Sequence, residues 1–210
     1  DQKTETYALV QEYAAPQSID PEKARHRFSE ILTVTALFTG IDADHVISKT
    51  RMRQKGTSQY ERLGESGRFS EIEEGGLRFL VNLADYLDTG IFLDHRLTRR
   101  IIQKEAEGKH MLNLFGYTGT ASVYAAKGGA LSTTTVDTSA TYLEWAKKNL
   151  ELNGFKGREH SLMREDVMEF LKTEKRTFGL IFCDPPSFSN SKDRPMTFDV
   201  QRDHAELIGL

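Results

Sequence analysis

Near the start of the chain, hydrophobic positions recur at helical spacing. Asp20-Pro21-Glu22 combines an N-cap acid, a proline at the first helical position and an acid in the first turn, which together mark a helix start. Gly40 provides a stop signal. The positions that would share one face are Ala24, Phe28, Ile31, Leu32 and Thr35. The pattern predicts a helix between these signals, and the polar residues 1–19 are interpreted as a linker or arm.

After about residue 45 the period changes from helical to alternating. The alternating or extended runs cover 46–55, 69–73 and 77–83. Glu74-Gly75-Gly76 separates the last two runs, and such a glycine turn between alternating runs predicts a β-hairpin. We therefore expect a linker and N-terminal helix over 1–44, followed by a small β-hairpin subdomain over 45–90.

From about residue 91, short apolar runs alternate with helical segments. The predicted strands cover 111–115, 133–136, 160–163 and 178–183. The predicted helices cover 121–127, 140–153, 167–172 and a segment that starts at about 199. This order predicts an α/β, Rossmann-like fold with a doubly wound parallel sheet, in which 178–183 is a buried strand beside the first one. Because a complete domain of this type has about three more strands, we expect the segment 91–210 to be incomplete.

Composition is typical of a globular chain with a real core. Hydrophobic residues make up 38% of the 210 residues and charged residues 28%, with a net charge of −3. No apolar run approaches the roughly 20 residues of a membrane span, and the start lacks both a signal peptide and an initiator Met. A single cysteine, Cys183, excludes an internal disulfide framework. We therefore expect a cytoplasmic protein, no membrane association, and a chain that belongs to a longer, possibly bifunctional polypeptide.

The first candidate site is the turn that follows the first predicted strand of the sheet. It contains Asn113, Phe115, Tyr117, Thr118 and Gly119. A glycine turn before a helix lets the backbone approach a ligand closely, and the helix N-terminus offers N–H groups to it. The alternative is an ordinary βα turn. A full dinucleotide fingerprint and a P-loop lysine are both absent from the sequence.

Two acids follow the next two predicted strands. Asp137, with Thr138 beside it, ends the second strand, where a carboxylate can accept hydrogen bonds from both hydroxyls of a ribose. The alternative role is a helix N-cap shared with Ser139. Asp166 follows the third strand and is placed either to contact an adenine edge or to cap the next helix.

The fourth predicted strand leads into Asp184-Pro185-Pro186-Ser187-Phe188. Two prolines remove two N–H donors and fix φ, which leaves a stiff loop with exposed carbonyls. Phe188, two residues later, can stack on a flat base. The loop would lie at the switch point of the sheet, where ligands bind in folds of this kind. Asp184, Pro185, Pro186 and Phe188 are therefore the predicted catalytic group, and no metal is expected.

Five stretches together resemble a known family. They are DYLDTGIFLDHR (85–96), LNLFGYTGTASVYAAKGGA (112–130), TTTVDTSATYLEWAKKNLELNG (133–154), CDPPSFSNSK (183–192) and FDVQRDH (198–204). In order and wording they resemble the class I S-adenosyl-L-methionine (SAM)-dependent methyltransferases that modify bacterial 23S rRNA. The resemblance is greatest to the guanine-N7 methyltransferase half of a fused protein, and it covers nearly the whole chain beyond about residue 18.

The resemblance implies SAM as cofactor and a guanine of 23S rRNA as substrate. It implies that Phe115, Tyr117 and Gly119 line the methionine end of SAM. Asp137 would then bind the ribose, Asp166 the adenine, and Asp184 would border the reacting methyl group. It also implies that Asp94, His95 and Arg96 close the cofactor site from the segment before the first strand of the sheet.

Three other functions stay open at this point. Cytosine-C5 methylation needs a cysteine thiolate that attacks the ring, and Cys183 is the only candidate. Because it alternates with Asp184 on a strand predicted to be buried, we expect it to point away from the loop and to be structural. A non-catalytic RNA-binding module would keep the fold without the chemistry. An NAD-dependent oxidoreductase is disfavoured by the missing fingerprint.

Two basic clusters are candidates for RNA contact despite the negative net charge. Lys49, Arg51, Arg53 and Lys55 occupy every second position, so on a strand all four would project from one face. The alternative is an ordinary solvated strand face. The second cluster, at close to helical spacing, consists of Arg96, Arg99, Arg100 and Lys104. Together they could form a positive track for a polyanion.

Overall fold

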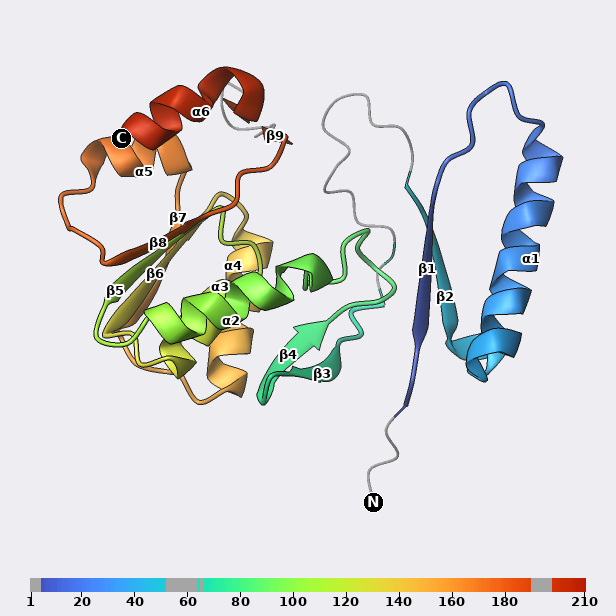
Figure 1. Cartoon of the computed structure of the whole chain (residues 1–210), viewed down its shortest axis with the longest axis horizontal. Helices are drawn as coiled ribbons and strands as arrows, with labels where there is room; N and C mark the ends of the chain where they lie inside the picture. The colour runs from blue at the N-terminus through green and yellow to red at the C-terminus, as the bar shows by residue number, and fades with distance from the viewer. Residues whose placement is uncertain (1–4, 52–63, 65, 190–197) are drawn as a thin grey trace. The chain divides into compact units, whose positions relative to one another are not determined.

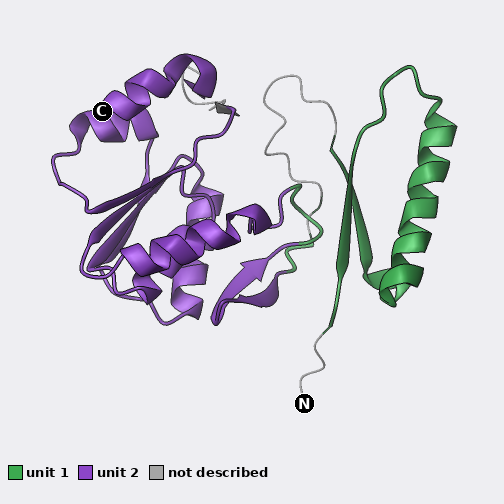
Figure 2. Ribbon diagram, in the orientation of Figure 1, with its two compact units in different colours: residues 1–68, 83–87 green, residues 69–82, 88–210 purple. Residues whose placement is uncertain are grey.

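The computed structural model describes residues 5–51, 64, 66–189 and 198–210 of the chain. It divides into two compact units, residues 1–68 with 83–87 and residues 69–82 with 88–210 (Figure 2). The second unit carries the parallel sheet, and the predicted α/β, Rossmann-like fold class is confirmed. Among the helices that the structure describes, none is long and apolar enough to cross a membrane.

The first unit is a β–α–β arrangement. β1 (Ala8–Tyr13) and β2 (Val46–Arg51) pair in parallel, and α1 (Pro21–Thr39) and the short η1 (Ala43–His45) connect them. Asp20 Oδ1 accepts the backbone N–H groups of Glu22 and Lys23, both at 2.9 Å, and so caps the start of α1. Gly40 ends the helix at φ 69°. The predicted start and end of this helix are confirmed.

β1 lies in the segment that the sequence predicted to be a linker, and that prediction is wrong for Ala8–Tyr13. The strand has no apolar face that would mark it, because Leu9 and Tyr13 are exposed while Glu12 is half-buried. Its backbone pairs with β2 in register from Ala8↔Val46 to Tyr13↔Arg51. A partner so distant in sequence decides the conformation, so local patterning could not reveal it.

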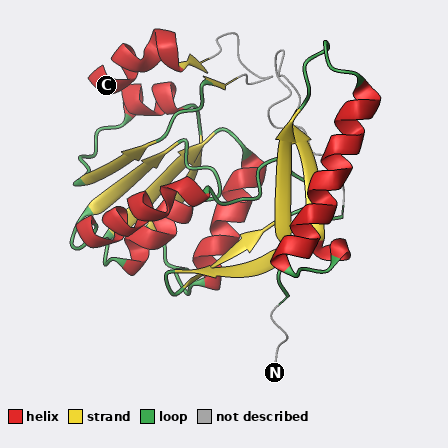
Figure 3. Cartoon of the chain, turned by 45° about the vertical axis from the view of Figure 1, so that its right-hand side comes forward, coloured by secondary structure: helices red, strands yellow, loops and turns green. Residues whose placement is uncertain are grey.

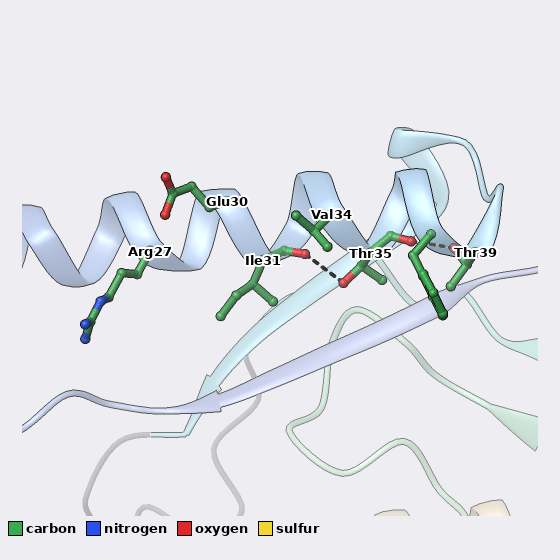
Figure 4. A pocket seen from close by; sticks show the side chains of 7 residues that line it. Arg27, Glu30, Ile31, Val34, Thr35 and Thr39 are labelled. Carbon is green, nitrogen blue, oxygen red and sulfur yellow. Dashed lines mark hydrogen bonds between the residues drawn. The ribbon is translucent and has the colours of Figure 1, made fainter.

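One side of α1 carries exposed apolar side chains. Ile31 is 50% exposed, Val34 61% and Phe38 90%, and they line a shallow pocket together with Arg27 and Glu30 (Figure 4). Ile31 was predicted to share one face with Ala24, Phe28, Leu32 and Thr35, and none of the helix's residues is fully buried.

The second unit begins with the predicted hairpin. β3 (Ser70–Glu74) and β4 (Leu77–Val81) pair in antiparallel with Glu74 opposite Leu77. Gly75 and Gly76, at φ 63° and 75°, form the two-residue turn, and this turn type needs positive φ at both positions. The hairpin prediction is confirmed.

The hairpin is attached to α4 (Ala140–Leu152) by side-chain hydrogen bonds. Trp145 Nε1 donates to the Leu80 carbonyl at 2.9 Å, and Asn149 Oδ1 accepts the Leu80 N–H at 2.9 Å. These bonds place the hairpin in the same compact unit as the sheet. The sequence predicted a separate β-hairpin subdomain over 45–90. In the structure the compact units divide this segment, with 69–82 and 88–90 in the second unit and the rest in the first.

The central sheet has the order β7-β6-β5-β8, and all its pairs are parallel. The strands are β5 (His110–Leu114), β6 (Ser132–Asp137), β7 (His160–Arg164) and β8 (Leu180–Cys183). The helices that alternate with them are α3 (Thr120–Lys127), α4 and α5 (Val167–Thr173); η3 (Leu93–His95) and α2 (Arg96–Glu105) precede the sheet. Two-residue strands β9 (Phe188–Ser189) and β10 (Phe198–Asp199) and α6 (Val200–Gly209) follow it. Figures 1 and 3 show this alternation. The switch point lies between β5 and β8, as predicted.

Alternation along β5 supplies both faces of the sheet. Leu112 and Leu114 pack in one core cluster with Phe170 of α5 and Leu207 of α6. Met111 faces the opposite side and packs with α2 and α3. β5 is therefore packed between α5 and α6 on one face and α2 and α3 on the other (Figure 1). The turn of the candidate site follows its carboxyl end.

β8 differs from the prediction of a buried strand. Ile181 is 55% exposed and Cys183 is exposed. Within the described residues only β5 pairs with β8, so it forms the edge of the sheet. A strand at an edge exposes side chains that a further strand would cover, and this is the physical reason for the difference.

Candidate active site

The predicted site residues come together at the carboxyl ends of β5, β6 and β8. The turn from Phe115 to Gly119 follows β5, Asp137 ends β6, and Asp184 follows β8. In open parallel sheets, ligands bind at this edge and at the switch point. The strand order therefore places the three predicted segments around one position.

The turn after β5 has an unusual backbone. Phe115 and Tyr117 have positive φ values of 56° and 48°, and Gly119 has 70°. Such φ values strain a residue with a side chain, and strain of this kind persists only where the surroundings hold it. Here the ring of Tyr117 packs 5.2 Å from Phe92 and 4.5 Å from Tyr142. These ring contacts therefore support the positive φ of Tyr117.

Asn113 and Thr118 support the turn and do not face its surface. Asn113 is 1% exposed and donates through Nδ2 to Ser122 Oγ at 3.0 Å. Thr118 is fully buried and donates through Oγ1 to the Gly90 carbonyl at 2.6 Å. The cofactor-binding role predicted for Asn113 and Thr118 stays a prediction, and their buried side chains do not support it. Asn113 alternates with Leu112 and Leu114 onto the face of β5 that α3 covers, and the side chain of Thr118 is directed to Gly90, so both are enclosed.

Asp137 connects the end of β6 to the turn. Its Oδ2 accepts the Tyr117 N–H at 2.9 Å, and its Oδ1 accepts the Ser139 N–H at 2.8 Å. Burial raises the pKa of Asp137, and the backbone hydrogen bonds from Ser139, Tyr117 and Thr138 counteract part of that rise. A carboxylate offers about four acceptor positions, so acceptor capacity remains for the hydroxyl groups of a ligand.

The other residues near the end of β6 and β7 have structural partners. Asp166 caps α5, because its Oδ1 accepts the N–H groups of Met168 at 3.0 Å and Glu169 at 3.2 Å. The carbonyl of Thr138 accepts a hydrogen bond from Arg164 Nε at 3.2 Å. The capping role weighed for Asp166 is present in the structure, and its contact with adenine stays a prediction.

Asp184 lies beside the segment that precedes α2. Its Oδ2 is 3.6 Å from His95 Nδ1, and the ring of His95 packs 5.9 Å from Phe182. Burial raises the pKa of Asp184; the charge of His95 lowers it and that of Asp94 raises it. The expected closure of the site by Asp94 and His95 is thus consistent with their position next to Asp184.

The proline loop continues from Asp184 at the same edge. Pro185 and Pro186 are half-buried, and the backbone of Phe188 lies in β9, opposite Asp199 of β10. The side chain of Phe188 lies outside the described residues, so its stacking role stays a prediction.

Comparison with known proteins gives the family. A family model described as S-adenosylmethionine-dependent methyltransferase matches residues 3–207. The chain belongs to that family. The expectations of an enzyme and of SAM as cofactor are confirmed at this level.

Curated relatives of this methyltransferase are named ribosomal RNA large subunit methyltransferase K/L. The protein of Pseudomonas putida (strain W619) is 59% identical over 201 residues, which is 96% of this chain and 27% of the relative. That of Vibrio cholerae (strain ATCC 39541) is 53% identical over 202 residues, 96% of the chain and 28% of the relative. The chain thus spans about a quarter of their length. The resemblance to the rRNA methyltransferases is confirmed.

Solved structures show the same fold. A putative methyltransferase complexed with SAH matches with a TM-score of 0.69 and 32% identity, over 86% of this chain and 48% of that one. A SAM-dependent methyltransferase from Agrobacterium tumefaciens matches with a TM-score of 0.62 and 27% identity, over 75% and 52% of the two chains. A complex of aTrm5 with tRNALeu, at 16% identity and a TM-score of 0.54, shares the fold.

The donor set of this methyltransferase fits SAM. Asp137 offers a carboxylate to hydroxyl groups, and Asp94 and Asp184 supply negative charge near the same sheet edge. SAM carries a positive sulfonium and a positive amino group, which acidic groups stabilise. The aromatic rings of Phe92 and Tyr142 pack on either side of the Tyr117 ring in the turn. The residues therefore match the charge and polarity of the cofactor.

Sequence reasoning missed Glu74 and Tyr124, which form a buried cluster beside α2. Arg96 Nε and Arg99 Nε donate to the buried Glu74 at 3.0 and 2.8 Å, and Tyr124 donates to the same carboxylate. Arg96 was expected to close the cofactor site, and that role stays a prediction. Arg99 was predicted in an exposed basic cluster, yet it is 2% exposed. Glu74 and Tyr124 are 50 positions apart, and no sequence pattern links them. Only the packing of α2 and α3 against the hairpin could have revealed them.

One residue of the predicted basic strand face, Lys49, is buried in the structure. Lys49 is 5% exposed, and its ammonium group donates to the carbonyls of Tyr86 and Leu87 within the first unit. Lys49 is therefore not part of an exposed basic strand face, because its ammonium group is hydrogen-bonded to these two carbonyls. Arg51 is half-buried at the end of β2, while Arg53 and Lys55 lie outside the described residues.

Proposed function

We propose that this methyltransferase transfers a methyl group from SAM to N7 of a guanine in 23S rRNA. The proposal includes a cytoplasmic setting and action as part of a longer, possibly bifunctional polypeptide. Its support for rRNA is the set of relatives named as rRNA large subunit methyltransferases, which share 51–59% identity with the chain. The support for methyl transfer is the family itself.

One structural observation carries the proposed chemistry. The ends of β5, β6 and β8 place the strained turn, the Asp137 carboxylate and the Asp184–His95 pair around one position. Bound SAM would supply an activated methyl group on a sulfonium. The protein then mainly contributes alignment and charge, which is what fixed groups of this kind provide.

Guanine N7 suits this set of groups. N7 carries a lone pair and no proton, so attack on a methyl group requires no general base. In our proposal Asp184 and the carbonyls of Pro185 and Pro186 position the base or the amino groups of the cofactor. Phe188 stacks on the base. Phe115, Tyr117 and Gly119 line the methionine end of SAM, Asp137 binds the ribose, and Asp166 contacts the adenine.

Cytosine-C5 methylation is the alternative chemistry, and the exposure of Cys183 makes it testable. The expectation that this cysteine is buried is wrong. However, partial desolvation and the negative charge of Asp184 raise the pKa of the Cys183 thiol. C5 attack needs the thiolate, which a raised pKa disfavours.

Cys183→Ser is therefore expected to retain methyl transfer in the full-length polypeptide. N7 attack forms no covalent adduct with the protein, so loss of the thiol removes no reacting group. The measurement is incorporation of labelled methyl from SAM into 23S rRNA, with thermal unfolding as a control for folding. Complete loss of incorporation at unchanged thermal stability would favour the C5 reaction.

The direct test of the proposed function is nucleoside mass spectrometry of 23S rRNA. RNA from cells that lack the gene should lack one N7-methylguanine, and the purified polypeptide with SAM should restore it. Restoration of a 5-methylcytosine, or of no methylated base, would contradict the proposal.

The exposed part of α2 is a candidate RNA contact of the second unit. Arg100 and Lys104 lie one turn apart and are both exposed. Arg100→Ala with Lys104→Ala should weaken rRNA binding and lower the slope of log affinity against log salt by about 0.7–0.9 for each lost phosphate contact. SAM affinity should stay at the wild-type value. An unchanged salt slope would show that this face does not contact RNA.

A further inference from the structure

A buried carboxylate outside the expected site joins three elements of the second unit. Glu74, the last residue of β3, is 7% exposed. Arg99 of α2 donates to it through Nε at 2.8 Å and through Nη2 at 2.9 Å. The hydroxyl of Tyr124 on α3 is 3.0 Å from Glu74 Oε1 and 3.0 Å from the Glu74 carbonyl oxygen. The hairpin is thus tied to the two helices that flank β5.

The protonation states of this cluster are well defined at neutral pH. Burial by itself would raise the pKa of Glu74, but hydrogen bonds from Arg99 and Arg96 and the charge of Arg99 hold it below its usual value. Burial, followed by the hydrogen bond and charge of Glu74, raises the pKa of Tyr124 to about 12. The carboxylate is therefore ionised and the phenol protonated.

Arg99 extends from this carboxylate toward the candidate site. Its Nη1 donates to the carbonyl of Phe92 at 2.8 Å. A guanidinium is planar and holds its N–H groups in a fixed fork, so the two bonds to Glu74 also fix the direction of Nη1. Phe92 immediately precedes η3, which ends at His95. One planar group therefore links the hairpin to the segment before α2.

That segment contacts two groups of the proposed methyl-transfer site. The ring of Phe92 packs 5.2 Å from the ring of the strained Tyr117. His95 Nδ1 lies 3.6 Å from Asp184 Oδ2. A change in the place of the Phe92 carbonyl would move both contacts, since the carbonyl lies only three residues before His95.

We propose that Glu74 is a positioning residue for methyl transfer, which fixes Arg99 and through it the place of Phe92 and His95 at the SAM site. This inference rests on the proposed function, because it assumes that SAM binds between the turn after β5 and Asp184. Glu74 itself contacts neither SAM nor the base.

A purely stabilising role would predict something different. A buried ion pair often contributes little to stability compared with well-packed apolar residues, so packing alone does not require these charges. The directed bond from Arg99 to a backbone carbonyl is the feature that apolar packing cannot supply. A positioning role therefore predicts a loss of cofactor affinity measured far below the unfolding temperature.

The test compares Glu74→Gln with the matched variant Glu73→Gln in the full-length polypeptide. Glu73 is the adjacent, exposed acid of the same strand. Glu74→Gln should raise the SAM dissociation constant about tenfold, the scale of one charge-assisted hydrogen bond, with RNA affinity unchanged. Glu73→Gln should bind SAM like the wild type.

Arg99→Lys separates charge from geometry. Lysine keeps the positive charge but lacks the fork that holds the carboxylate and the Phe92 carbonyl together, so SAM affinity should fall as in Glu74→Gln. If Glu74→Gln does not fold, Tyr124→Phe provides a milder change. It removes the hydroxyl that donates to the Glu74 carboxylate but keeps the charges of Glu74 and Arg99, and SAM affinity should fall about threefold.

Three results would bear on the proposal differently. Weaker SAM binding in Glu74→Gln and Arg99→Lys, but not in Glu73→Gln, supports it. A lower unfolding temperature with unchanged SAM affinity in Glu74→Gln overturns it and leaves the proposed function intact. If the wild-type polypeptide does not bind SAM, both the proposed function and this inference are overturned.

Discussion

Asp137→Ala is expected to weaken SAM binding by at least about a hundredfold. In the proposed site its carboxylate accepts hydrogen bonds from two ribose hydroxyls, and each bond to a charged acceptor contributes about 1.5–3 kcal/mol. The two together correspond to about 3–6 kcal/mol, and each 1.4 kcal/mol is a factor of about ten in affinity. The carboxylate also orders the turn through the N–H of Tyr117 at 2.9 Å.

Calorimetric titration with SAM measures this change, and Glu144→Ala is a suitable control because Glu144 is an exposed acid on α4. Thermal unfolding of Asp137→Ala is measured alongside, because the substitution also removes the acceptor of the Tyr117 and Ser139 N–H groups. Unchanged SAM affinity in Asp137→Ala would exclude the ribose role.

The pH dependence of SAM binding gives an independent check on Asp137. Burial raises its pKa, so the carboxyl takes up a proton at a higher pH than an ordinary aspartate as the solution is acidified. The protonated group loses acceptor capacity, and SAM affinity should therefore fall as pH falls through that raised pKa. In Asp137→Ala the decrease should be smaller, and what remains should come from Asp184, whose pKa burial also raises.

Gly90→Ala is expected to destabilise the second unit by about 2–6 kcal/mol. Gly90 has φ 103°, a conformation that costs a residue with a side chain about 1–3 kcal/mol. A Cβ there would lie 2.2 Å from Cζ2 of Trp145, and overpacking of this kind costs about 1–3 kcal/mol more. The unfolding temperature should fall by about 6–18 °C, at roughly 3 °C per kcal/mol for a domain of this size.

Gly108→Ala separates strain from collision. Gly108 also has positive φ, 67°, but a Cβ there meets nothing within 4 Å. The expected loss is therefore about 1 kcal/mol, or about 3 °C, from backbone strain alone. Calorimetry of both variants measures the difference. Equal unfolding temperatures for Gly90→Ala and Gly108→Ala would show that the Trp145 side chain moves away from the new Cβ without loss of stability.

Gly90→Ala should also weaken SAM binding in the fraction that folds. The carbonyl of Gly90 accepts the hydroxyl of Thr118 at 2.6 Å, and Thr118 lies inside the turn of the proposed cofactor site. A shift of Gly90 away from Trp145 would therefore move the turn.

The sequence by itself determined the elements whose signals are local. The Asp20 cap and Gly40 marked α1, and Gly75-Gly76 marked the hairpin, because cap and turn residues act through bonds and φ values within a few positions. The order of strands and helices determined the parallel sheet and its switch point, since connections of this kind leave few topologies. The motifs at the strand ends were therefore placed on the correct edge.

The tertiary structure alone decided what depends on distant partners. β1 forms because it pairs with β2 (Val46–Arg51). Lys49 is buried because its ammonium group donates hydrogen bonds to the carbonyls of Tyr86 and Leu87. The side chains of Asn113 and Thr118, two residues predicted to bind the cofactor, are buried because the strand and turn direct them into the core. Glu74 and Arg99 meet across 25 positions, through the packing of α2 against the hairpin. Contacts over such separations are set by the assembled layers, which no local pattern of residues encodes.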